Sequence, residues 1–573
     1  MQLPLIIVVG GDELALRVCE ELTSTRGHDV VLLWSADEQL AARATSVGAS
    51  FVGLPPNDYE SLRTVGVMHA TSIMPVAEED RLNLQVALKA RDLNPKIRVV
   101  LRQFNRTLAR KLEQNLPDCS AVSLSAHAAA TYAGAALDPA CFFALQFPDF
   151  DGPLLGFSER AASDFCIAGV SIEEAERRLR ARIISVAGQT NLELTHVLQG
   201  QERVVAFGPM DEMGDSWPRS TATPAKESLA SRSASAFRAF LRAVRRTEPL
   251  LLRIFAAGAA VAIIAVFYFM WALHLDIVRS LYYVITTMAT VGYGDITPVI
   301  NKGPLTSFFA AMFIMVSGIA ITGVFIAAIT AALNRAQLTA LRGLRRLTSR
   351  DHIVVCGAGN IGTRVIEFLL KMRRKVVVVE ESPDNLLIER ARDRQLDLLT
   401  GDATSDGTLR FCNLRHACSV VALTGSDTAN LEVGLGARAG SARLGVVLRI
   451  SDSAFAHSVS RQFHITKSFS AIDLTAPAIA GLSRFPGTRG RVAFENEEYN
   501  VGERLQGAVP TPPPADLCIP LYVWREDALI ALHDFSEMKP YDRLLFIVPL
   551  SQFRGRERAS SVQGERSSEL APT

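Results

Sequence analysis

Two long apolar runs dominate the middle of the chain. Residues 254–273 and 304–333 span 20 and 30 residues and contain no Asp, Glu, Lys or Arg. A helix of about 20 apolar residues crosses the roughly 30 Å hydrocarbon core of a bilayer, and in lipid the backbone must satisfy its own hydrogen bonds. Two buried helices of a soluble domain are the alternative, but uncharged helices of this length are rare there. The runs therefore predict two membrane-spanning helices, at about 250–273 and 304–333.

Basic residues lie outside both ends of this region. They precede the first run and follow the second, and they comprise Arg242, Arg245, Arg246, Arg253, Arg335, Arg342, Arg345 and Arg346. Because Lys and Arg concentrate on the cytoplasmic side of membrane proteins, we expect both termini in the cytoplasm. The expected location is the cell (inner) membrane, which the chain would cross more than once.

The length and composition limit what the rest of the chain can be. At roughly 150 residues per domain, 573 residues indicate three to four domains. The 60 Lys and Arg against 59 Asp and Glu leave a net charge of +1, which argues against a nucleic-acid partner. The eight cysteines include no C-x-x-C pair, so neither a zinc site nor a disulfide framework is indicated. We expect buried thiols in a reducing compartment, and no bound metal.

The segment between the apolar runs, 276–295, is too structured for a plain loop. Asp276 is placed to cap a short helix through IVRSLYYVITTMA, and a stretch with alternate glycines follows. Gly292 and Gly294 can take positive φ, so that successive carbonyls turn toward one axis. Non-helical backbone at membrane depth is tolerated where it lines an aqueous path. A re-entrant helix and loop here therefore predict a pore.

The block SLYYVITTMATVGYGDITP, residues 280–298, resembles the pore loop of tetrameric potassium channels. The resemblance implies that four chains surround one axis and that rings of backbone carbonyls replace the water around K+. In the family an aromatic pair, here Tyr282 and Tyr283, surrounds the filter tyrosine, and Asp295 follows the filter. A chance glycine turn is the alternative. The resemblance assigns the selectivity filter to Thr290, Val291, Gly292, Tyr293 and Gly294.

The second apolar run resembles the inner helix of the same channels. Gly318 would match the family's hinge glycine, and Gly323 and Ala327 follow it toward the cytoplasmic crossing. Glycines in membrane helices also allow close helix packing, and the sequence leaves both interpretations open. No helix carries Arg at every third position, so we expect no voltage sensor.

The two flanks of the membrane region repeat each other. Three pairs of residues are each separated by 347 positions, namely Gly10 and Gly357, Asp80 and Asp427, and Arg102 and Arg449. A fixed offset of this kind indicates that one module occurs twice. The predicted fold is therefore multidomain, with two α/β Rossmann-like modules flanking an all-α, two-helix pore domain.

The C-terminal copy contains a dinucleotide-binding fingerprint. A strand, a G-x-G-x-x-G turn and a helix succeed one another, and two glutamates end the next strand about 20 residues on. Gly359 lets amides at the helix start approach a pyrophosphate, and Glu380 can accept hydrogen bonds from a ribose. A carboxylate there disfavours a 2′-phosphate, so NAD(H) or an adenine nucleotide is the expected ligand. The expected contacts are Gly357, Gly359, Asn360, Ile361, Gly362, Glu380 and Glu381.

This copy resembles the RCK, or TrkA-N, regulatory domain of potassium channels and transporters. The sequence GDAT at 401–404, Asn430-Leu431 and Leu448-Arg449 carry the resemblance, which covers about 350–475. It adds Asp402 to the expected ligand contacts. The segment 490–550 resembles the smaller RCK-C lobe, although any small α+β domain would show the same alternation.

The N-terminal copy has lost the fingerprint. Asp12 and Ala15 stand where the other copy has its second and third glycines. Asp12 would put a carboxylate where phosphates approach, and Leu33 and Trp34 occupy the strand end that carries the glutamates in the other copy. We therefore interpret this copy as a structural partner in a ring, with nucleotide binding as the less favoured interpretation.

Seven segments follow from these patterns. They are an N-terminal module at 1–150, a small lobe at 151–210, a flexible Ser/Ala/Pro-rich linker at 211–249, the pore domain at 250–335, a C-terminal module at 350–475, a second lobe at 476–550 and a polar tail at 551–573. Within the pore domain, the pore helix and filter occupy 276–295. The basic segment 334–350 is expected to link the inner helix to the module.

The expected function is a potassium channel that a ligand opens or closes. The resemblance implies a homotetramer in the membrane, with eight modules in a gating ring. A membrane-tethered, NAD-dependent oxidoreductase is one alternative, but no His, Lys or Tyr constellation marks a substrate site. A regulatory subunit of a separate potassium transporter is another, and it would leave Thr290 to Gly294 without a role.

Overall fold

The structure is a computed structural model that describes residues 3–25, 27–147, 152–213, 249–341, 349–393, 395–441, 443–495, 497–505, 518–539 and 541–550. It divides into two compact units, one from the two flanks of the chain and one from residues 221–345. Each unit is described by itself. Residues 214–248 of the expected linker, the polar tail and the basic residues 342–348 lie outside the described residues.

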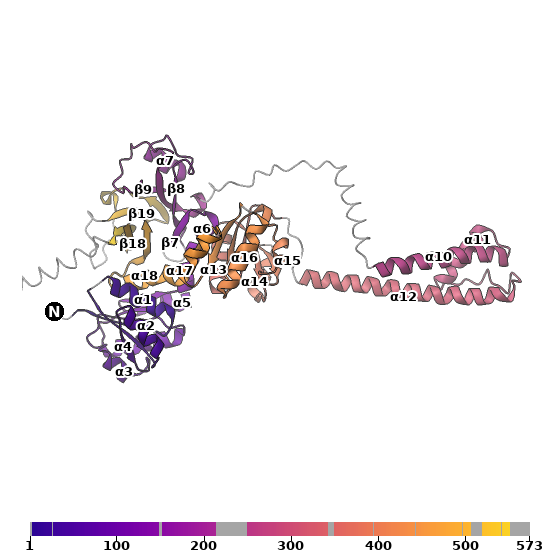
Figure 1. Ribbon diagram of the computed structural model, residues 1–573, viewed down its shortest axis with the longest axis horizontal. Helices are drawn as coiled ribbons and strands as arrows, with labels where there is room; N and C mark the ends of the chain where they lie inside the picture. The colour runs from indigo at the N-terminus through magenta and orange to yellow at the C-terminus, as the bar shows by residue number, and fades with distance from the viewer. Residues whose placement is uncertain are drawn as a thin grey trace, which may run out of the picture. The chain divides into compact units, whose positions relative to one another are not determined.

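The N-terminal module is a parallel sheet of six strands in the order β3-β2-β1-β4-β5-β6 (Figure 1). The strands are β1 (Leu5–Val9), β2 (Asp29–Trp34), β3 (Ser50–Gly53), β4 (Ser72–Pro75), β5 (Arg98–Arg102) and β6 (Cys119–Val122). The helices between them are α1 (Glu13–Ser24), α2 (Glu38–Ser46), α3 (Tyr59–Thr64), α4 (Asp80–Leu93) and α5 (Arg106–Asn115). The central strand β1 has the wholly apolar sequence LIIVV, which suits a strand whose two faces are both covered by helices.

The C-terminal module repeats this topology in the order β13-β12-β11-β14-β15-β16. Its strands are β11 (His352–Cys356), β12 (Lys375–Glu380), β13 (Asp397–Thr400), β14 (Ala417–Ala422), β15 (Gly445–Arg449) and β16 (Lys467–Phe469). Its helices are α13 (Asn360–Lys371), α14 (Asn385–Arg392), α15 (Asp406–Phe411), α16 (Asp427–Gly440) and α17 (Ser453–Gln462). β11, α16 and β15 begin 347 residues after β1, α4 and β5, so the predicted repeat and the α/β fold class are confirmed.

Each module packs on a helix that follows the parallel sheet of the other module in the sequence. α6 (Leu124–Leu137) follows the N-terminal sheet but packs on the C-terminal module, where Tyr132 donates a 2.7 Å hydrogen bond to the carbonyl of Phe469. α18 (Ala471–Leu482) follows the C-terminal sheet but packs on α1. The alanine-rich sequence of α6 allows this, since small side chains let a helix be buried on nearly every side.

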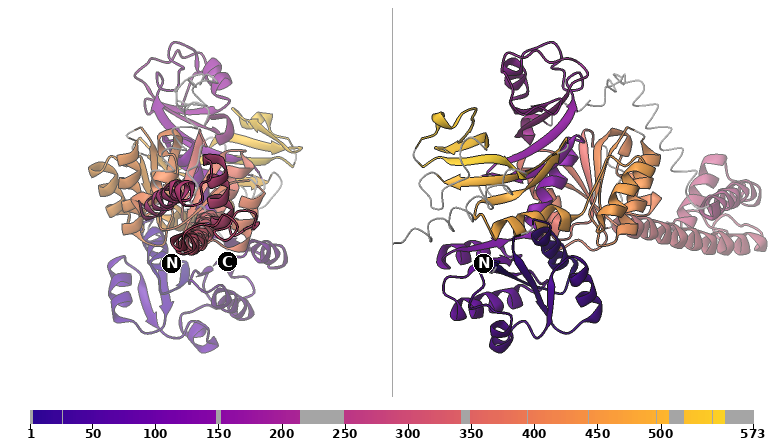
Figure 2. Two further views of the ribbon diagram at one scale, coloured as in Figure 1. Left: turned by 90° about the vertical axis from the view of Figure 1, so that its right-hand side faces the viewer. Right: turned by 60° about the vertical axis from the view of Figure 1, so that its left-hand side comes forward.

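Two antiparallel sheets form the small lobes. One has the order β7-β8-β10-β9, with β7 (Cys141–Gln146), β8 (Leu154–Ala161), β9 (Arg182–Val186) and β10 (Arg203–Pro209), accompanied by α7 (Ile172–Leu179) and α8 (Met210–Met213). The other has the order β17-β18-β21-β19-β20, with β17 (Thr488–Phe494), β18 (Glu497–Leu505), β19 (Ile519–Arg525), β20 (Ala528–Ala531) and β21 (Arg543–Pro549). Figure 2 shows the yellow strands of the second lobe beside the violet strands of the first, and they share an aromatic core. β7 belongs to the lobe, so the parallel sheet ends before residue 141 and not near 150.

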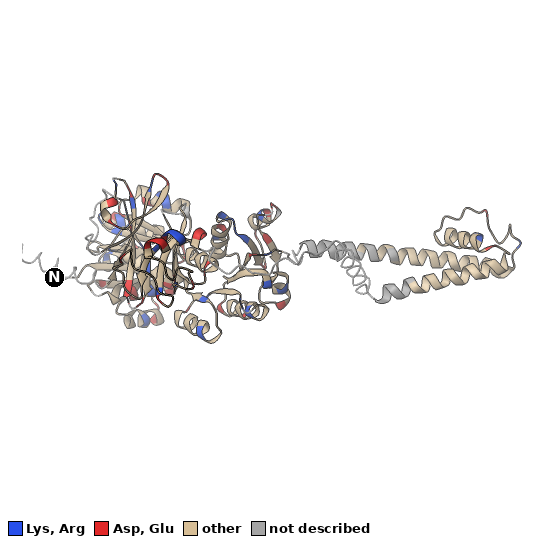
Figure 3. Cartoon of the chain, turned by 90° about the horizontal axis from the view of Figure 1, so that it is seen from above, with Lys and Arg blue, Asp and Glu red and all other residues tan. Residues whose placement is uncertain are grey.

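The described residues of the second unit form three helices. α10 (Pro249–Ala272) packs on α12 (Leu305–Leu341), and the short α11 (Ile277–Met288) lies between them in sequence. By length and composition, residues 305–324 of α12 could cross a membrane, and residues 256–272 of α10 form a shorter apolar stretch, within the described part of the chain. Figure 3 shows few charged residues along the described lengths of α10 and α12.

The cysteines differ in part from the expectation of buried thiols. None of the eight, all of which the structure describes, forms a disulfide, and five are buried, but Cys166 is exposed and Cys119 and Cys418 are partly exposed. Cys166 occupies a turn with φ of 58°, between β8 and α7, where no apolar face covers it. The prediction of uniform burial is therefore wrong for this residue.

Candidate functional site

The pore loop follows directly on the pore helix. α11 begins after Asp276, as predicted, although the Asp276 side chain makes no cap hydrogen bond. The helix is anchored to α10 because the buried Ser280 hydroxyl donates to the carbonyl of Val266 at 2.7 Å. The loop then folds back, and the amides of Val291 and Gly292 donate to the carbonyl of Thr286 at 2.9 and 3.2 Å.

The backbone of the loop alternates between two conformations. Thr290, Gly292 and Gly294 have φ of 60°, 51° and 77°, whereas Val291 and Tyr293 do not have positive φ. Alternation with a period of two turns successive carbonyls toward the same side, in contrast to a strand, where they point to opposite sides. Glycine takes this conformation without a Cβ clash, and Thr290 takes it at a cost in backbone strain.

The two predicted aromatic residues behave differently within one chain. The ring of Tyr282 stacks on that of Tyr293, with centroids 6.3 Å apart and planes within 4°. Tyr283 instead faces α10, where it meets the ring of Phe269 edge-on at 5.0 Å. Tyr282 therefore packs on the filter segment and Tyr283 on the first membrane helix, while the supporting role of Asp295 stays a prediction.

The inner-helix glycines also have different environments. A Cβ at Gly318 would lie 2.2 Å from the carbonyl oxygen of Met288, so this glycine lets α12 approach the end of the pore helix. A Cβ at Gly323 would meet nothing within 4 Å, and Ala327 is exposed. α12 continues as one helix through both glycines. The structure thus gives Gly318 a packing contact, while its role as a hinge stays a prediction.

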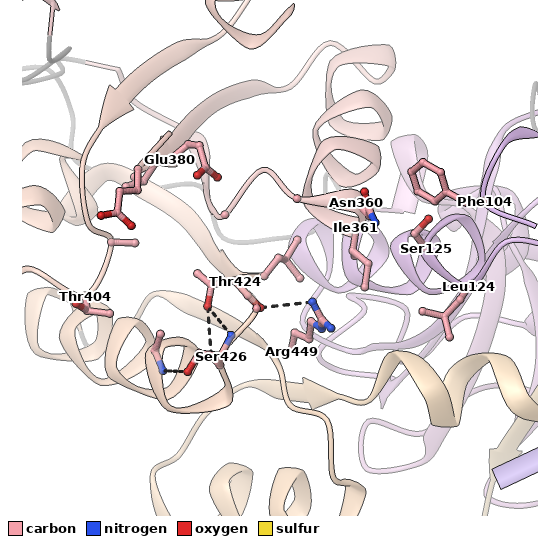
Figure 4. Close-up of a pocket in the computed structure, with 18 of the residues that line it drawn as sticks. Phe104, Leu124, Ser125, Asn360, Ile361, Glu380, Thr404, Thr424, Ser426 and Arg449 are labelled. Atoms are coloured by element: carbon pink, nitrogen blue, oxygen red, sulfur yellow. Dashed lines mark hydrogen bonds between the residues drawn. The ribbon is translucent and has the colours of Figure 1, made fainter. Parts of the chain in front are cut away.

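A cavity of about 990 Å³ opens at the carboxyl ends of the C-terminal strands (Figure 4). Gly357 has φ of +92° and no room for a Cβ, which would lie 2.9 Å from the amide of Thr424. A Cβ at Gly362 would lie 2.0 Å from the carbonyl of Gly357. Gly359 has open space around it and begins α13, and no side chain caps this helix. The first turn of α13, with Asn360 and Ile361, therefore faces the cavity with uncapped amides.

The predicted carboxylates border the same cavity. Glu380 ends β12, and its carboxylate accepts hydrogen bonds from the amides of Ala358 and Ser382 at 2.6 and 3.2 Å. It is thus tied to the glycine turn, with lone pairs left for a ligand. Glu381 lines the cavity beside it. Asp402 also lines the cavity, but its carboxylate accepts from the amide and hydroxyl of Thr404, both at 2.8 Å, so it shapes its own turn.

The corresponding place in the N-terminal module is filled by its own side chains. The Asp12 carboxylate caps α1 by accepting from the amide of Ala15 at 3.1 Å, and Arg102 Nη1 donates to it at 2.8 Å. Burial raises the pKa of Asp12, although the Ala15 amide and Arg102 oppose the shift. Trp34 covers the turn, since a Cβ on Gly11 would lie 2.2 Å from its indole nitrogen.

The strand register corrects one sequence assignment. Val9 pairs with Leu33, and Cys356 pairs with Val379, so Trp34 and not Leu33 is the equivalent of Glu380. The offset in this strand is 346 rather than 347, because the connection between β1 and β2 is one residue longer than its counterpart in the C-terminal module. Leu33 is buried in the sheet.

Sequence reasoning missed several residues that line the cavity. Arg449 lines it, with Nη1 3.5 Å from the carbonyl of Thr424, and no carboxylate of the described chain forms an ion pair with it. The repeat pairs Arg449 with Arg102 and could have identified it. The N-terminal module supplies Phe104, Ser123, Leu124 and Ser125 to the cavity, and no local pattern marks them. No group of metal-ligating side chains suited to a metal ion occurs among the residues that the structure describes.

Comparisons with known families match both modules and the pore domain. The TrkA-N domain model matches residues 6–119 and 353–470, and the ion channel model matches residues 255–335. These matches confirm the predicted combination of two TrkA-N modules with a channel domain, and they place the chain with channels rather than enzymes.

The individual proteins that resemble this chain do so at low sequence identity. The voltage-gated potassium channel Kch of Escherichia coli is 28% identical over 182 residues, which is 31% of this chain and 43% of that protein. Potassium channel protein 1 of Methanocaldococcus jannaschii is 29% identical over 170 residues, or 28% of this chain and 49% of that protein. The chain thus spans less than half the length of these curated relatives. A solved structure of the GsuK channel bound to NAD is 15% identical, with a TM-score of 0.48, over 97% of this chain and 79% of that one.

Proposed function

Since the chain belongs to the ion channel proteins that carry TrkA-N domains, we propose that it is a potassium-selective channel regulated by a ligand. One observation carries the proposal. The backbone of Thr290, Gly292 and Gly294 takes positive φ at alternate residues, between the pore helix α11 and the helix α12. Four such segments around an axis would line it with carbonyl oxygens, which can replace the hydration shell of K+.

A single chain cannot form this pore. The filter side chains are open to solvent in the chain by itself, and Tyr293 is 70% exposed. A homotetramer would bury them and would bring together eight modules as a gating ring. The pore unit would lie in the cell (inner) membrane, with both termini in the cytoplasm, as the flanking arginines indicate.

The effector would be an adenine nucleotide or NAD(H) in the C-terminal module. The N-terminal module offers an internal analogue, because its Asp12 carboxylate lies between the start of α1 and Arg102. By the repeat, an anionic diphosphate would lie between the start of α13 and Arg449. Its ribose would then face the Glu380 carboxylate at the other side of the glycine turn.

The energy that gating requires is within reach of such a site. Moving a pore from about 1% to about 99% open takes roughly 5.5 kcal/mol of differential affinity, which is about 1.4 kcal/mol for each of four equivalent sites. One or two charge-assisted hydrogen bonds that form in only one state supply that much.

Among the described residues that line the cavity there is no His, Lys, Tyr or Cys, and its acid–base side chains are carboxylates. A sensor needs only differential binding, which the residues present can supply.

Potassium flux through the purified protein in liposomes, with no partner present, tests the proposal. We expect K+ flux that exceeds Na+ flux and that changes when nucleotide is added to the face bearing the modules. Flux without selectivity would contradict the filter assignment, and no flux under any condition would favour a regulatory subunit of another pore.

A further inference from the structure

In the chain, the helix α12 precedes the C-terminal module, and β11 is the first strand after it. We propose that a set of side chains at the amino end of β11 clamps the chain where it enters this module, and that these are positioning residues for the regulation of the pore. The inference rests on the proposed function, because it names residues that the ligand's effect depends on. The set, called the entry clamp, comprises Ser349, Asp351, His352, Asp397, Asn413 and His416.

Ser349 is held from two sides before β11 begins. Its hydroxyl donates to the Asp397 carboxylate, at the start of β13, at 2.6 Å. Its carbonyl accepts from Nδ2 of Asn413 at 2.8 Å. The Oδ1 atom of Asn413 can only accept, so Nδ1 of His416, 3.1 Å away, donates to it and fixes the orientation of the amide. The entering chain is therefore tied to two separate segments of the module.

The residues that follow are held by the turn that precedes β14. This turn contains the short helix η2 (Leu414–His416), and the amide of Asp351 donates to the carbonyl of His416 at 2.9 Å. The fully buried His352 donates from Nε2 to the carbonyl of Cys412 at 2.8 Å. The chain is thus fixed at its entry by hydrogen bonds other than those between the strands of the sheet.

The N-terminal module shows that the fold does not require these bonds. Ile7 pairs with Ile73 and Val354 pairs with Val420, so the offset of 347 residues holds in this part of the sheet. By that offset, the counterparts of Asp351, His352 and Asn413 are Pro4, Leu5 and Gly66. Proline has no amide hydrogen, and the side chains of leucine and glycine offer no donor.

The turn itself has the same conformation in both modules. Asn413 has φ of 53° and Gly66 has φ of 81°, and the amides of His416 and His69 donate to the carbonyls of these two residues at 2.9 and 3.0 Å. Asparagine tolerates the left-handed region better than most residues, but glycine suits it best. Among the described residues, the bonds of the entry clamp therefore occur in the module that follows α12 and have no equivalent in the other module.

The position of the entry clamp suits it to transmit movement. β11 connects the clamp at its amino end to the glycine turn of the cavity at its carboxyl end, and all five of its residues are buried. Opening of a folded chain costs little free energy at strand ends and more toward the core. An unclamped end would therefore fray when the module moved, and side-chain hydrogen bonds make such fraying rarer. The displacement of β11 is then passed on to the chain that leads to α12.

Asn413→Gly tests the inference, because it copies the N-terminal module and suits the positive φ. We expect calorimetry with ADP and NAD+ to give wild-type affinities, and liposomes to show the wild-type preference for K+ over Na+. The change in K+ flux that nucleotide causes should fall roughly fivefold or more, since the coupling between the site and the pore is weakened. In hydrogen exchange, the amide of Asp351 should exchange about tenfold faster than in wild type.

A second pair of variants tests the other side of the entry clamp. Asp397→Ala removes the acceptor of the Ser349 hydroxyl and should reduce the response to nucleotide as Asn413→Gly does. Asp397→Asn keeps an oxygen that accepts from this hydroxyl, so it should retain the response. A general loss of stability would not distinguish these two variants by their response at unchanged nucleotide affinity.

Asn94 provides a matched control in the N-terminal module. Its Nδ2 donates to the carbonyls of Val67 and Ala70 at 3.0 and 3.2 Å, in the turn that corresponds to the one before β14. Asn94→Ala thus removes two bonds of the same kind at the same edge of the other sheet. It should lower the melting temperature and leave the response to nucleotide as in wild type.

The outcomes separate the inference from the proposed function. If Asn413→Gly and Asp397→Ala respond to nucleotide as wild type does, or if Asn94→Ala loses the response equally, the entry clamp is only structural. If no nucleotide changes flux in wild type, the proposed effector is wrong, and unliganded K+ flux then decides on the entry clamp. Asn413→Gly should change that flux and Asn94→Ala should not, and equal flux in both variants and wild type would refute the inference.

Discussion

Arg102 Nη1 donates to Asp12 Oδ2 at 2.8 Å at the start of α1. In the N-terminal module the Asp12 carboxylate takes the place that an anionic ligand would take beside Arg449 in the C-terminal module. The carboxylate caps the helix, the guanidinium neutralises it, and no ligand is needed to hold β5 against the glycine turn. Because this module carries its own anion, we expect it to support the ring, and we expect the C-terminal module to sense the nucleotide.

Copying this feature into the C-terminal module should disable its site. Gly359→Asp places a carboxylate at the start of α13, where it can cap the helix and pair with Arg449. A Cβ at this position meets nothing within 4 Å, so the fold should tolerate the change. We expect calorimetry to show loss of nucleotide binding, at least 100-fold, while the melting temperature rises or stays the same. Gly359→Ala is the control, and if it abolishes binding equally, the added charge is not the cause.

Removing the guanidinium should have a smaller effect on the same site. Arg449→Ala deletes the cation that faces the phosphates, and a hydrogen bond to a charged group contributes about 1.5–3 kcal/mol. We expect a 10- to 100-fold loss of ADP affinity, with partial recovery in Arg449→Lys, which keeps the charge but not the bidentate fork. Arg102→Ala should leave nucleotide affinity almost unchanged. A greater loss in Arg102→Ala than in Arg449→Ala would contradict the assignment.

The filter geometry can be tested at Gly292. Its φ of +51° is one that residues with a Cβ rarely adopt, so Gly292→Ala should displace the carbonyl of this residue. We expect loss of the preference for K+ over Na+ in liposome flux, with the tetramer retained on gel filtration. Gly323→Ala, where a Cβ meets nothing within 4 Å in the chain, should keep the preference. A selective Gly292→Ala tetramer would refute the role of this glycine.

The packing role of Gly318 makes a separate prediction. Because its Cβ would overlap the backbone of Met288, Gly318→Ala should push α12 away from the pore helix and lower thermal stability. We expect a lower melting temperature and altered filter selectivity. A pure hinge would instead change open probability and leave both stability and selectivity as in wild type. The two interpretations are therefore distinguished by one variant.

Two partly buried histidines should make the soluble unit sensitive to acid. Burial lowers the pKa of His127 to about 4, with Arg489 adding to the effect, and burial together with Arg484 lowers that of His28 to about 4. The unfolded chain takes up these protons near pH 6.5, while the folded chain does so only near pH 4. Stability is therefore complete above about pH 6.5 and is lost as the pH falls toward 4.

The measurement is the melting temperature of the full chain as a function of pH. Between pH 6.5 and 4 we expect a steeper fall in wild type than in the double variant His28→Leu, His127→Leu, which cannot take up these protons. Equal slopes would show that both imidazoles are already protonated in the folded protein or that their pKa values are unchanged by folding.

Several features could be predicted from the sequence because they depend on residues close together in the chain. A G-x-G-x-x-G turn between a strand and a helix uses backbone constraints at Gly357 and Gly362 that act over a few residues. The same is true of the alternation around Gly292. The uncharged runs and the offset of 347 residues are likewise properties of composition and spacing. These patterns determined the fold class, the repeat and the loss of the N-terminal fingerprint.

The tertiary structure decided which residues meet across long separations. Nothing local to α6 indicates that it packs on a module more than 200 residues away, or that Arg364 holds Phe104 at the wall of the cavity. The same holds for Trp34 on Gly11 and for Gly318 against Met288. Such contacts depend on shape complementarity between whole elements, and many sequences with the same hydrophobic pattern satisfy it differently. Composition and spacing therefore determined the modules, and packing between them decided where the C-terminal cavity ends and which module closes it.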